Sequence, residues 1–217
     1  MSSSNSIDAG YSLAAAVDDF KKGVEFFQIH QWTLAEPLLS KAREKFRSEN
    51  QQQLVLETTY LLANLHLQGP DYPQGLVEFG SLEQLANGLQ HMKYYEISLF
   101  MQGFCRYKLG QYSEVIATLN KITIEKSQFL SKLQYFSYLG RSFSKLKDHT
   151  QAIEVFKRAL AISFNTPSST GEDKLMAQVY YDLGLEYHQA IIDEIRRAGL
   201  KDLDRKSTRL NSSHRIR

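Results

Sequence analysis

The chain has one cysteine, four prolines and no long apolar run among its 217 residues. A single cysteine excludes an internal disulfide and a zinc site built from cysteines. No stretch approaches the roughly 18 apolar residues that a membrane-spanning helix needs. The opening residues, MSSSNSIDAG, lack the charged and apolar regions of a signal peptide. The sequence therefore predicts an intracellular protein located in the cytoplasm, with the nucleus as the alternative compartment.

Signatures of catalysis are also missing. No two of the six histidines lie three to five residues apart, which removes a helical metal pair, and neither GxSxG nor a P-loop occurs. Cys105 follows Gly103 within an apolar stretch, which predicts a buried, inert thiol rather than a nucleophile. We predict no enzymatic activity, no metal and no cofactor.

The end of the chain differs from the rest. Residues 204–214, DRKSTRLNSSH, resemble the conceptual translation of a common short-read sequencing adapter at all eleven positions. We interpret 204–217 as an artefactual tail and expect the natural reading frame to have been interrupted near Leu203. The whole chain has a net charge of +2, but residues 1–203 carry 21 basic and 23 acidic side chains, a net of −2. This balance argues against a nucleic-acid partner.

A spaced pattern of small and apolar residues recurs four times. A small residue is followed at +12 by a small or aliphatic residue, and at +16 and +19 by further apolar or small ones. The four sets are Gly23 with Ala35, Leu39 and Ala42; Ala63 with Gly75, Phe79 and Leu82; Gly103 with Val115, Leu119 and Ile122; and Gly140 with Ala152, Phe156 and Ala159. The small residues recur at intervals of 40, 40 and 37 residues. Gly184 follows 44 residues later, but Arg196 stands where its small partner is expected.

This spacing predicts pairs of antiparallel helices that approach closely at the small residues. One pair cannot bury its apolar surface alone, so such units stack in rows. We expect an all-α fold, a right-handed α-α superhelix (solenoid) of antiparallel helix pairs. The expected helices are 12–29, 33–47, 51–68, 74–87, 90–109, 112–125, 128–146, 149–163 and 173–198, with a loop at 164–173.

The pattern resembles the tetratricopeptide repeat (TPR) and extends over an array at 12–200, after a disordered N-terminus at 1–11. The expected units are 16–49, 56–89, 96–129, 133–166 and a partial 177–200. The best match is the fourth unit, with Phe136, Leu139, Gly140, Phe143, Ala152, Phe156 and Ala159. The resemblance implies a non-enzymatic adaptor or scaffold for protein binding.

In this family the first helix of each pair lines a concave groove, and the resemblance implies which side chains do so here. They are Tyr60, Asn64, Phe100, Phe104, Tyr107, Lys108, Arg141, Lys145, Tyr181 and His188. Rings would hold apolar anchors, Asn64 a peptide amide, and the cations acidic groups. The alternative is that several of these rings pack against neighbouring repeats, or are covered by an N-terminal segment or by a C-terminal segment missing from this sequence.

Some family members clamp the carboxylate tail of a chaperone with lysine, asparagine and arginine on the inner helices. Only Asn64 fits that arrangement here, because the other positions are Phe20, Val24, Ile97 and Met101. We therefore predict no such clamp.

Two other functional classes are alternatives to the adaptor. One is an N-terminal regulatory TPR arm of a larger enzyme, such as a kinase, phosphatase or ligase. The other is an RNA-binding helical repeat, which the net charge of −2 and the aromatic groove disfavour. The partner is expected to be a protein or peptide and neither nucleic acid nor membrane. The sequence does not indicate whether the array self-associates.

Overall fold

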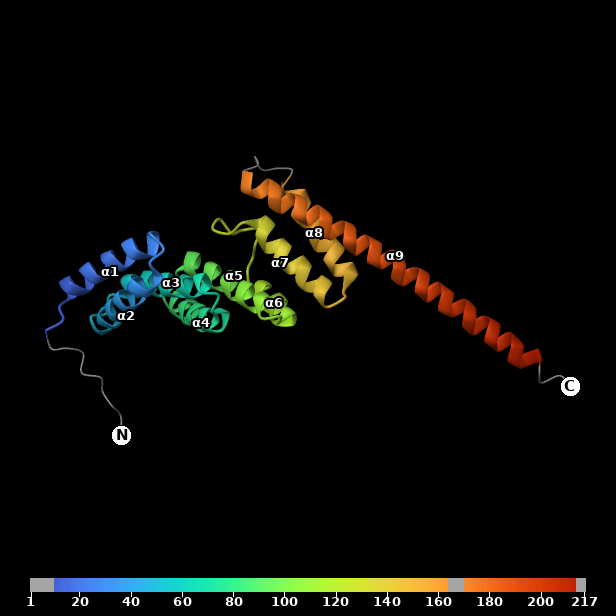
Figure 1. The fold of residues 1–217 in the computed structure, drawn as a ribbon, viewed down its shortest axis with the longest axis horizontal. Helices are drawn as coiled ribbons and strands as arrows, with labels where there is room; N and C mark the ends of the chain where they lie inside the picture. Colours follow the sequence, from blue (N-terminus) through green and yellow to red (C-terminus); the bar gives the residue numbers. More distant parts are fainter. Residues whose placement is uncertain (1–9, 164–169, 214–217) are drawn as a thin grey trace, which may run out of the picture. The chain divides into compact units, whose positions relative to one another are not determined.

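The computed structural model describes residues 10–163 and 170–213, with side chains placed over 10–161 and 173–199. All regular structure in these ranges is helical, which confirms the predicted all-α class. The helices are α1 (Leu13–Gln28), α2 (Trp32–Ser48), α3 (Gln52–Gln68), α4 (Tyr72–Gly88), α5 (Met92–Lys108), α6 (Tyr112–Leu119), α7 (Lys132–Lys145), α8 (His149–Ser163) and α9 (Thr170–Ser213) (Figure 1).

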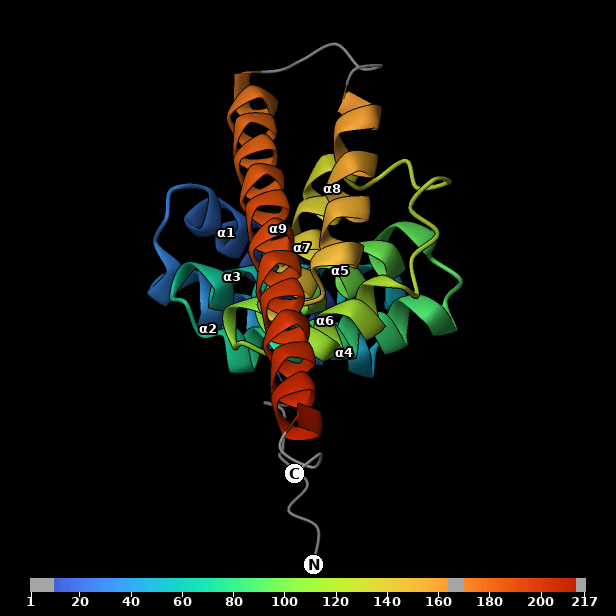
Figure 2. The same cartoon turned by 90° about the vertical axis from the view of Figure 1, so that its right-hand side faces the viewer.

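The chain divides into two compact units, Met1–Leu130 and Ser131–Arg217. In the first unit each of the helices α1 to α6 packs against the next, and α1 also contacts α3. In the second unit α7 packs against α8, and α9 contacts both. Figure 2 shows α8 and α9 running side by side. Each unit is therefore built from the consecutive antiparallel helix packing that the sequence predicts.

Short, closely similar turns end most of the helices. The second residue after α1, α2, α4, α5 and α7 has a positive φ, between 54° and 76°, and in four of the five turns it is not glycine. The next N–H then bonds back to the helix, as in Gln51 N–H to Phe46 O at 2.8 Å. This closure satisfies carbonyls that the helix end leaves unpaired and reverses the chain in three residues.

In three of the four sets the glycine lies against the side chain at +16. A Cβ added to Gly23 would lie 2.8 Å from the Leu39 side chain, and one added to Gly103 would lie 2.7 Å from Leu119. At Gly140 it would lie 2.6 Å from the Phe156 ring. The other predicted packing positions are also buried: Ala35, Ala63, Gly75, Val115, Ala152 and Ala159. These contacts set the distance between paired helices.

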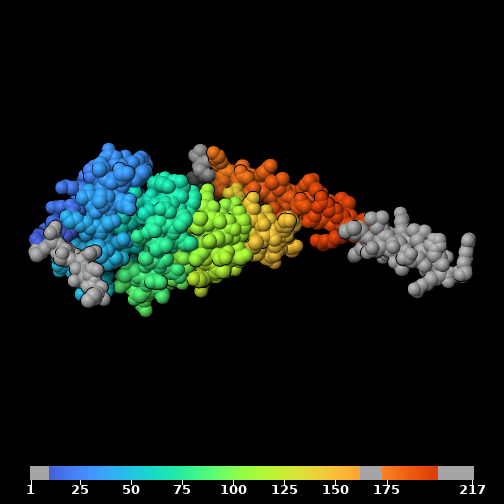
Figure 3. Space-filling model, turned by 60° about the horizontal axis from the view of Figure 1, so that its bottom comes forward, coloured from blue at the N-terminus to red at the C-terminus, as the bar shows by residue number. Residues whose placement is uncertain are grey.

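Gly184 does not play this role, and its assignment as a packing position is wrong. Nothing lies within 4 Å of a Cβ built there, and the residue is exposed. α9 instead faces α7 and α8 through residues such as Val179 and Glu186, which are buried. Large apolar side chains remain exposed along it: Tyr180, Tyr181, Leu185, Tyr187, Ile191 and Ile195. In Figure 3 the part of α9 with placed side chains forms an exposed ridge, coloured orange to red.

The third predicted repeat, 96–129, also departs from the prediction. The helix expected at 112–125 ends at Leu119, and the one expected at 128–146 begins only at Lys132. Residues 122–124 read Ile-Thr-Ile, and β-branched residues favour helix less. The connecting segment buries Ile122 and Ile124 and is held by Ser127 Oγ, which donates to Glu96 Oε2 at 2.5 Å. Ile122 therefore reaches the core from outside the helix.

Both ends of the chain bear on earlier predictions. Residues 1–9 of the expected disordered N-terminus lie outside the described residues, and α1 starts after Ser12, whose Oγ accepts from Ala15 N–H at 3.1 Å. α9 begins at Thr170, inside the loop expected at 164–173, and the residues of that loop before it lie outside the description. The helix extends through 204–213, while 214–217 are not described; the adapter interpretation of this tail stays a prediction.

Cys105 is buried in the core of the first unit, as predicted, beside Leu56, Ala63 and Phe79. Burial raises the pKa of the Cys105 thiol to about 11. We therefore expect iodoacetamide to alkylate the native protein at pH 8 far more slowly than the protein in denaturant, because the nucleophilic thiolate is scarce and enclosed. Mass spectrometry of timed samples measures both rates. Equal rates would contradict the burial of this side chain.

Candidate protein-interaction surface

The predicted groove residues of the first unit lie on α3 and α5. Tyr60 and Asn64 are one turn apart on α3, and Phe104 and Lys108 have the same spacing on α5, so each pair shares a helix face. Tyr60, Asn64, Phe104 and Tyr107 are half-buried, and Lys108 is exposed. Phe100 is buried and contributes to packing more than to an open surface. We call Tyr60, Asn64, Phe104, Tyr107 and Lys108 the inner face of the first unit.

The rings of the inner face are held by rings of neighbouring segments. Tyr60 lies 5.4 Å from Tyr94 between ring centroids. Phe104 lies 5.9 Å from Tyr72, edge to face. Tyr107 makes a similar contact with Tyr112 at 5.6 Å. Such contacts fix the ring orientations while part of each ring stays accessible. The alternative in which rings pack against neighbouring repeats therefore holds in part.

Two polar groups lie beside these rings. The Asn64 amide donates through Nδ2 to the Tyr60 carbonyl at 2.7 Å, within α3. That bond orients the amide and leaves its Oδ1 as an acceptor. Lys108 Nζ lies 5.4 Å from the centroid of the Phe104 ring, within cation–π range. The inner face thus combines rings, an amide acceptor and an exposed cation.

The predicted groove residues of the second unit differ from one another in exposure and in charge pairing. Arg141 Nε donates to Asp182 Oδ2 at 2.6 Å, so its charge is paired with α9. Lys145, one turn further on α7, is exposed. Tyr181 on α9 is 63% exposed, and His188 is exposed two turns later. Arg141 therefore anchors α9, and Lys145 is the more accessible cation of the two.

The sequence analysis missed a buried polar cluster between the helices of the second unit. Glu186 on α9 is 6% exposed and accepts from Ser144 Oγ at 2.5 Å. Its second oxygen is hydrogen-bonded to His149 Nδ1 at 2.6 Å, and His149 Nε2 lies 3.7 Å from Asp193. His149 occupies the first position of α8, but nothing in the linear sequence links it to a residue 37 positions later.

In the described part of the chain, no group of three or more His, Cys, Asp or Glu side chains could hold a metal ion. Within those ranges, too, no helix combines the length and apolarity needed to cross a membrane.

Comparison with known proteins agrees with the helix-pair architecture. Residues 138–166 match the tetratricopeptide repeat and lie within the predicted fourth repeat, 133–166. No curated protein sequence matches the chain significantly.

Several solved structures have a similar fold. The apo form of RapI matches with a TM-score of 0.65 and 15% identity, covering 86% of this chain and 59% of RapI. A putative kinesin light chain from Podosopora anserina with nearly identical TPR-like repeats matches with a TM-score of 0.61 and 14% identity, covering 88% of this chain and 98% of that one.

Aspartyl phosphate phosphatase F from Bacillus subtilis matches with a TM-score of 0.67 and 18% identity, covering 85% of this chain and 48% of the phosphatase. The chain thus spans about half the length of two of these proteins. The repeat match and the shared helical fold agree: residues 138–166 match a tetratricopeptide repeat, and the chain is similar in fold to these helical-repeat proteins.

Proposed function

We propose that this protein is a non-enzymatic interaction module that binds a partner peptide on the inner face of its first unit. The observation that carries the proposal is the grouping of half-buried rings with Asn64 and Lys108 on α3 and α5. Rings fixed by other rings lose little conformational freedom on binding, which favours them as contact residues.

The chemistry of the inner face suggests the kind of peptide. Tyr60, Phe104 and Tyr107 suit apolar or aromatic side chains. The Asn64 oxygen can accept from a peptide N–H, and Lys108 can pair with a carboxylate. The expected ligand is therefore a peptide segment that combines apolar anchors with an acidic residue.

Arg141 is not proposed as a ligand for acidic groups, since Asp182 already neutralises it. In the second unit Lys145, Tyr181 and His188 are the accessible candidates. The chaperone-tail clamp is still not expected, because Ile97 and Met101 supply no cation on α5. We propose a protein or peptide partner in the cytoplasm or nucleus.

The test is a peptide selected from a random library against the intact chain, followed by binding measurements on variants. Lys108→Glu is expected to weaken binding about tenfold, because it replaces attraction to an acidic residue with repulsion. Lys126→Glu makes the same charge change at an exposed residue between α6 and α7, outside the inner face, and serves as the control. Equal losses in both variants, or no loss in either, would contradict the site. Circular dichroism verifies that both variants keep their helicity.

The second candidate is the regulatory arm of a larger enzyme. The observation in its favour is that the chain covers only 59% of RapI and 48% of the phosphatase. Reading the transcript beyond the codon for Leu203 distinguishes the two proposals. A catalytic signature downstream would favour the arm, and a stop codon after a few dozen residues would favour a free-standing adaptor.

A further inference from the structure

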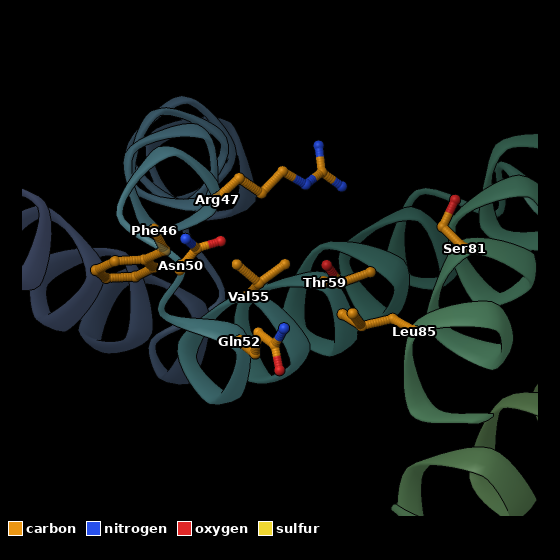
Figure 4. A pocket seen from close by; sticks show the side chains of 8 residues that line it. All are labelled: Phe46, Arg47, Asn50, Gln52, Val55, Thr59, Ser81 and Leu85. Atoms are coloured by element: carbon orange, nitrogen blue, oxygen red, sulfur yellow. The ribbon is translucent and has the colours of Figure 1, made fainter. Parts of the chain in front are cut away.

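A pocket of about 190 Å³ opens at the surface of the first unit, between the end of α2, the start of α3 and the second half of α4 (Figure 4). It is separate from the inner face, because none of the eight residues that line it belongs to that set. They are Phe46, Arg47, Asn50, Gln52, Val55, Thr59, Ser81 and Leu85.

The inner end of this pocket is apolar and well ordered by packing. Phe46 and Val55 are buried members of one core cluster, against which Leu85 also packs. A cavity of about 150 Å³ lined by apolar side chains is large enough for benzene. The pocket therefore has room for a benzene-sized ring or a branched aliphatic group, and is too small for a nucleotide.

The outer end is polar and carries a positive charge. Arg47 extends along one side of the pocket and Gln52 lies on the other, with Val55 and Thr59 between them (Figure 4). The Arg47 guanidinium pairs with Glu44, one turn earlier on the exposed surface of α2, at 2.8 Å. Exposed pairs of this kind hold a guanidinium weakly. None of the eight lining residues is acidic, so an anion meets no repulsion from them.

Thr59 adds an independent sign of a ligand. Its side chain lines the pocket and is 1% exposed, yet Oγ1 has no hydrogen-bond partner among the described residues. Buried hydroxyls are nearly always paired, because an unmade hydrogen bond costs free energy. A polar ligand atom that enters with a small local adjustment would supply the partner.

We propose that this pocket binds a small carboxylate whose apolar part is a benzene-sized ring or a branched aliphatic group. The apolar part contacts Phe46, Val55 and Leu85, and the carboxylate pairs with Arg47 while one of its oxygens accepts from the Thr59 hydroxyl. This second site is independent of the proposed peptide surface, so either can fail without the other.

The test uses 3-phenylpropionate as the probe and 3-phenylpropionamide as its uncharged analogue, with the full chain, by NMR titration. A ligand of this size is expected to bind with a Kd of about 1 mM, and the amide at least about fivefold more weakly. Arg47→Gln should remove the difference between acid and amide. Ser81→Phe, at the exposed rim, should abolish binding of both by filling the opening.

Arg196→Gln, an exposed arginine of the second unit, is the matched control and should bind both probes like the wild type. Binding of acid and amide with equal affinity, insensitivity to Ser81→Phe, or no shift at about 10 mM probe would overturn the proposal. A tripeptide ending in phenylalanine that binds more tightly than 3-phenylpropionate, again dependent on Arg47, would overturn it in favour of a polypeptide C-terminus.

Discussion

Gly140→Leu is expected to lower the free energy of unfolding of the second unit by about 3 kcal/mol, the upper end of the usual range for overpacking. A Cβ at this position would lie 2.6, 2.8 and 2.9 Å from three carbons of the Phe156 ring. Real Cβ atoms do not approach ring carbons this closely, so either the ring or one of the two helices must move. Phe156 is fully buried, and its displacement would disturb the packing of α7 on α8.

Gly184→Leu provides the matched control within the same unit. Gly184 lies in the interior of α9 with open space around it, so leucine meets no obstacle there. Glycine disfavours helix by about 1 kcal/mol relative to good helix formers, and this variant should be neutral or slightly stabilised. The stability of both variants is measured by chemical denaturation, monitored by circular dichroism, and by hydrogen exchange of the α7 and α8 amides. Equal stability of the two variants would mean that the close approach of α7 and α8 does not exist.

The second large effect is expected at Glu186. Glu186→Ala should cost about 3 kcal/mol, because it removes a buried carboxylate and strands its two partly buried partners. Ser144 and His149 both point their polar atoms at Glu186, at 2.5 and 2.6 Å. These contacts and the pair between Arg141 and Asp182 hold α9 against α7 and α8. Loss of Glu186 should therefore speed hydrogen exchange in α9 before it affects the first unit.

Glu194→Ala removes the same charge from the same helix at an exposed position and should change stability by less than about 0.5 kcal/mol. Glu186→Gln should fall between the two, since the amide keeps one acceptor oxygen but turns an N–H₂ group toward the other donor. If Glu186→Ala and Glu194→Ala unfold at the same denaturant concentration, the buried cluster does not contribute to the stability of the unit.

Much of the architecture could be predicted from spacing alone. The spacing around Gly23, Gly103 and Gly140 predicted paired helices in close approach, and the structure places these glycines against Leu39, Leu119 and Phe156. The reason is local: a helix, a three-residue turn and a second helix of fixed length bring +16 opposite the small residue. Any sequence with this periodicity meets the same geometry.

The departures arose where burial overrode helical periodicity. Leu119, Ile122 and Ile124 all reach the core, although α6 stops at the first of them. Gly184 has the right sequence position for a helix contact, but no neighbouring helix is packed against it. In both cases a residue of the expected type is present, but contacts with other parts of the chain determine whether it lies in a helix or packs against one.

The candidate site was predictable as a list of residues and not as a set of roles. Tyr60 lies on α3, and Phe104 and Lys108 share one face of α5, because helical spacing is a local property; that these residues line a groove stays a prediction. Arg141 was expected to bind an acidic ligand, but Asp182, 41 residues away, pairs with it. The pocket between α2, α3 and α4 and the Glu186 cluster likewise join distant residues. By itself the sequence determined most of the helices and their pairing, because these depend on local periodicity. Tertiary structure decided which charges are paired and where cavities form, because these depend on contacts between residues far apart in the chain.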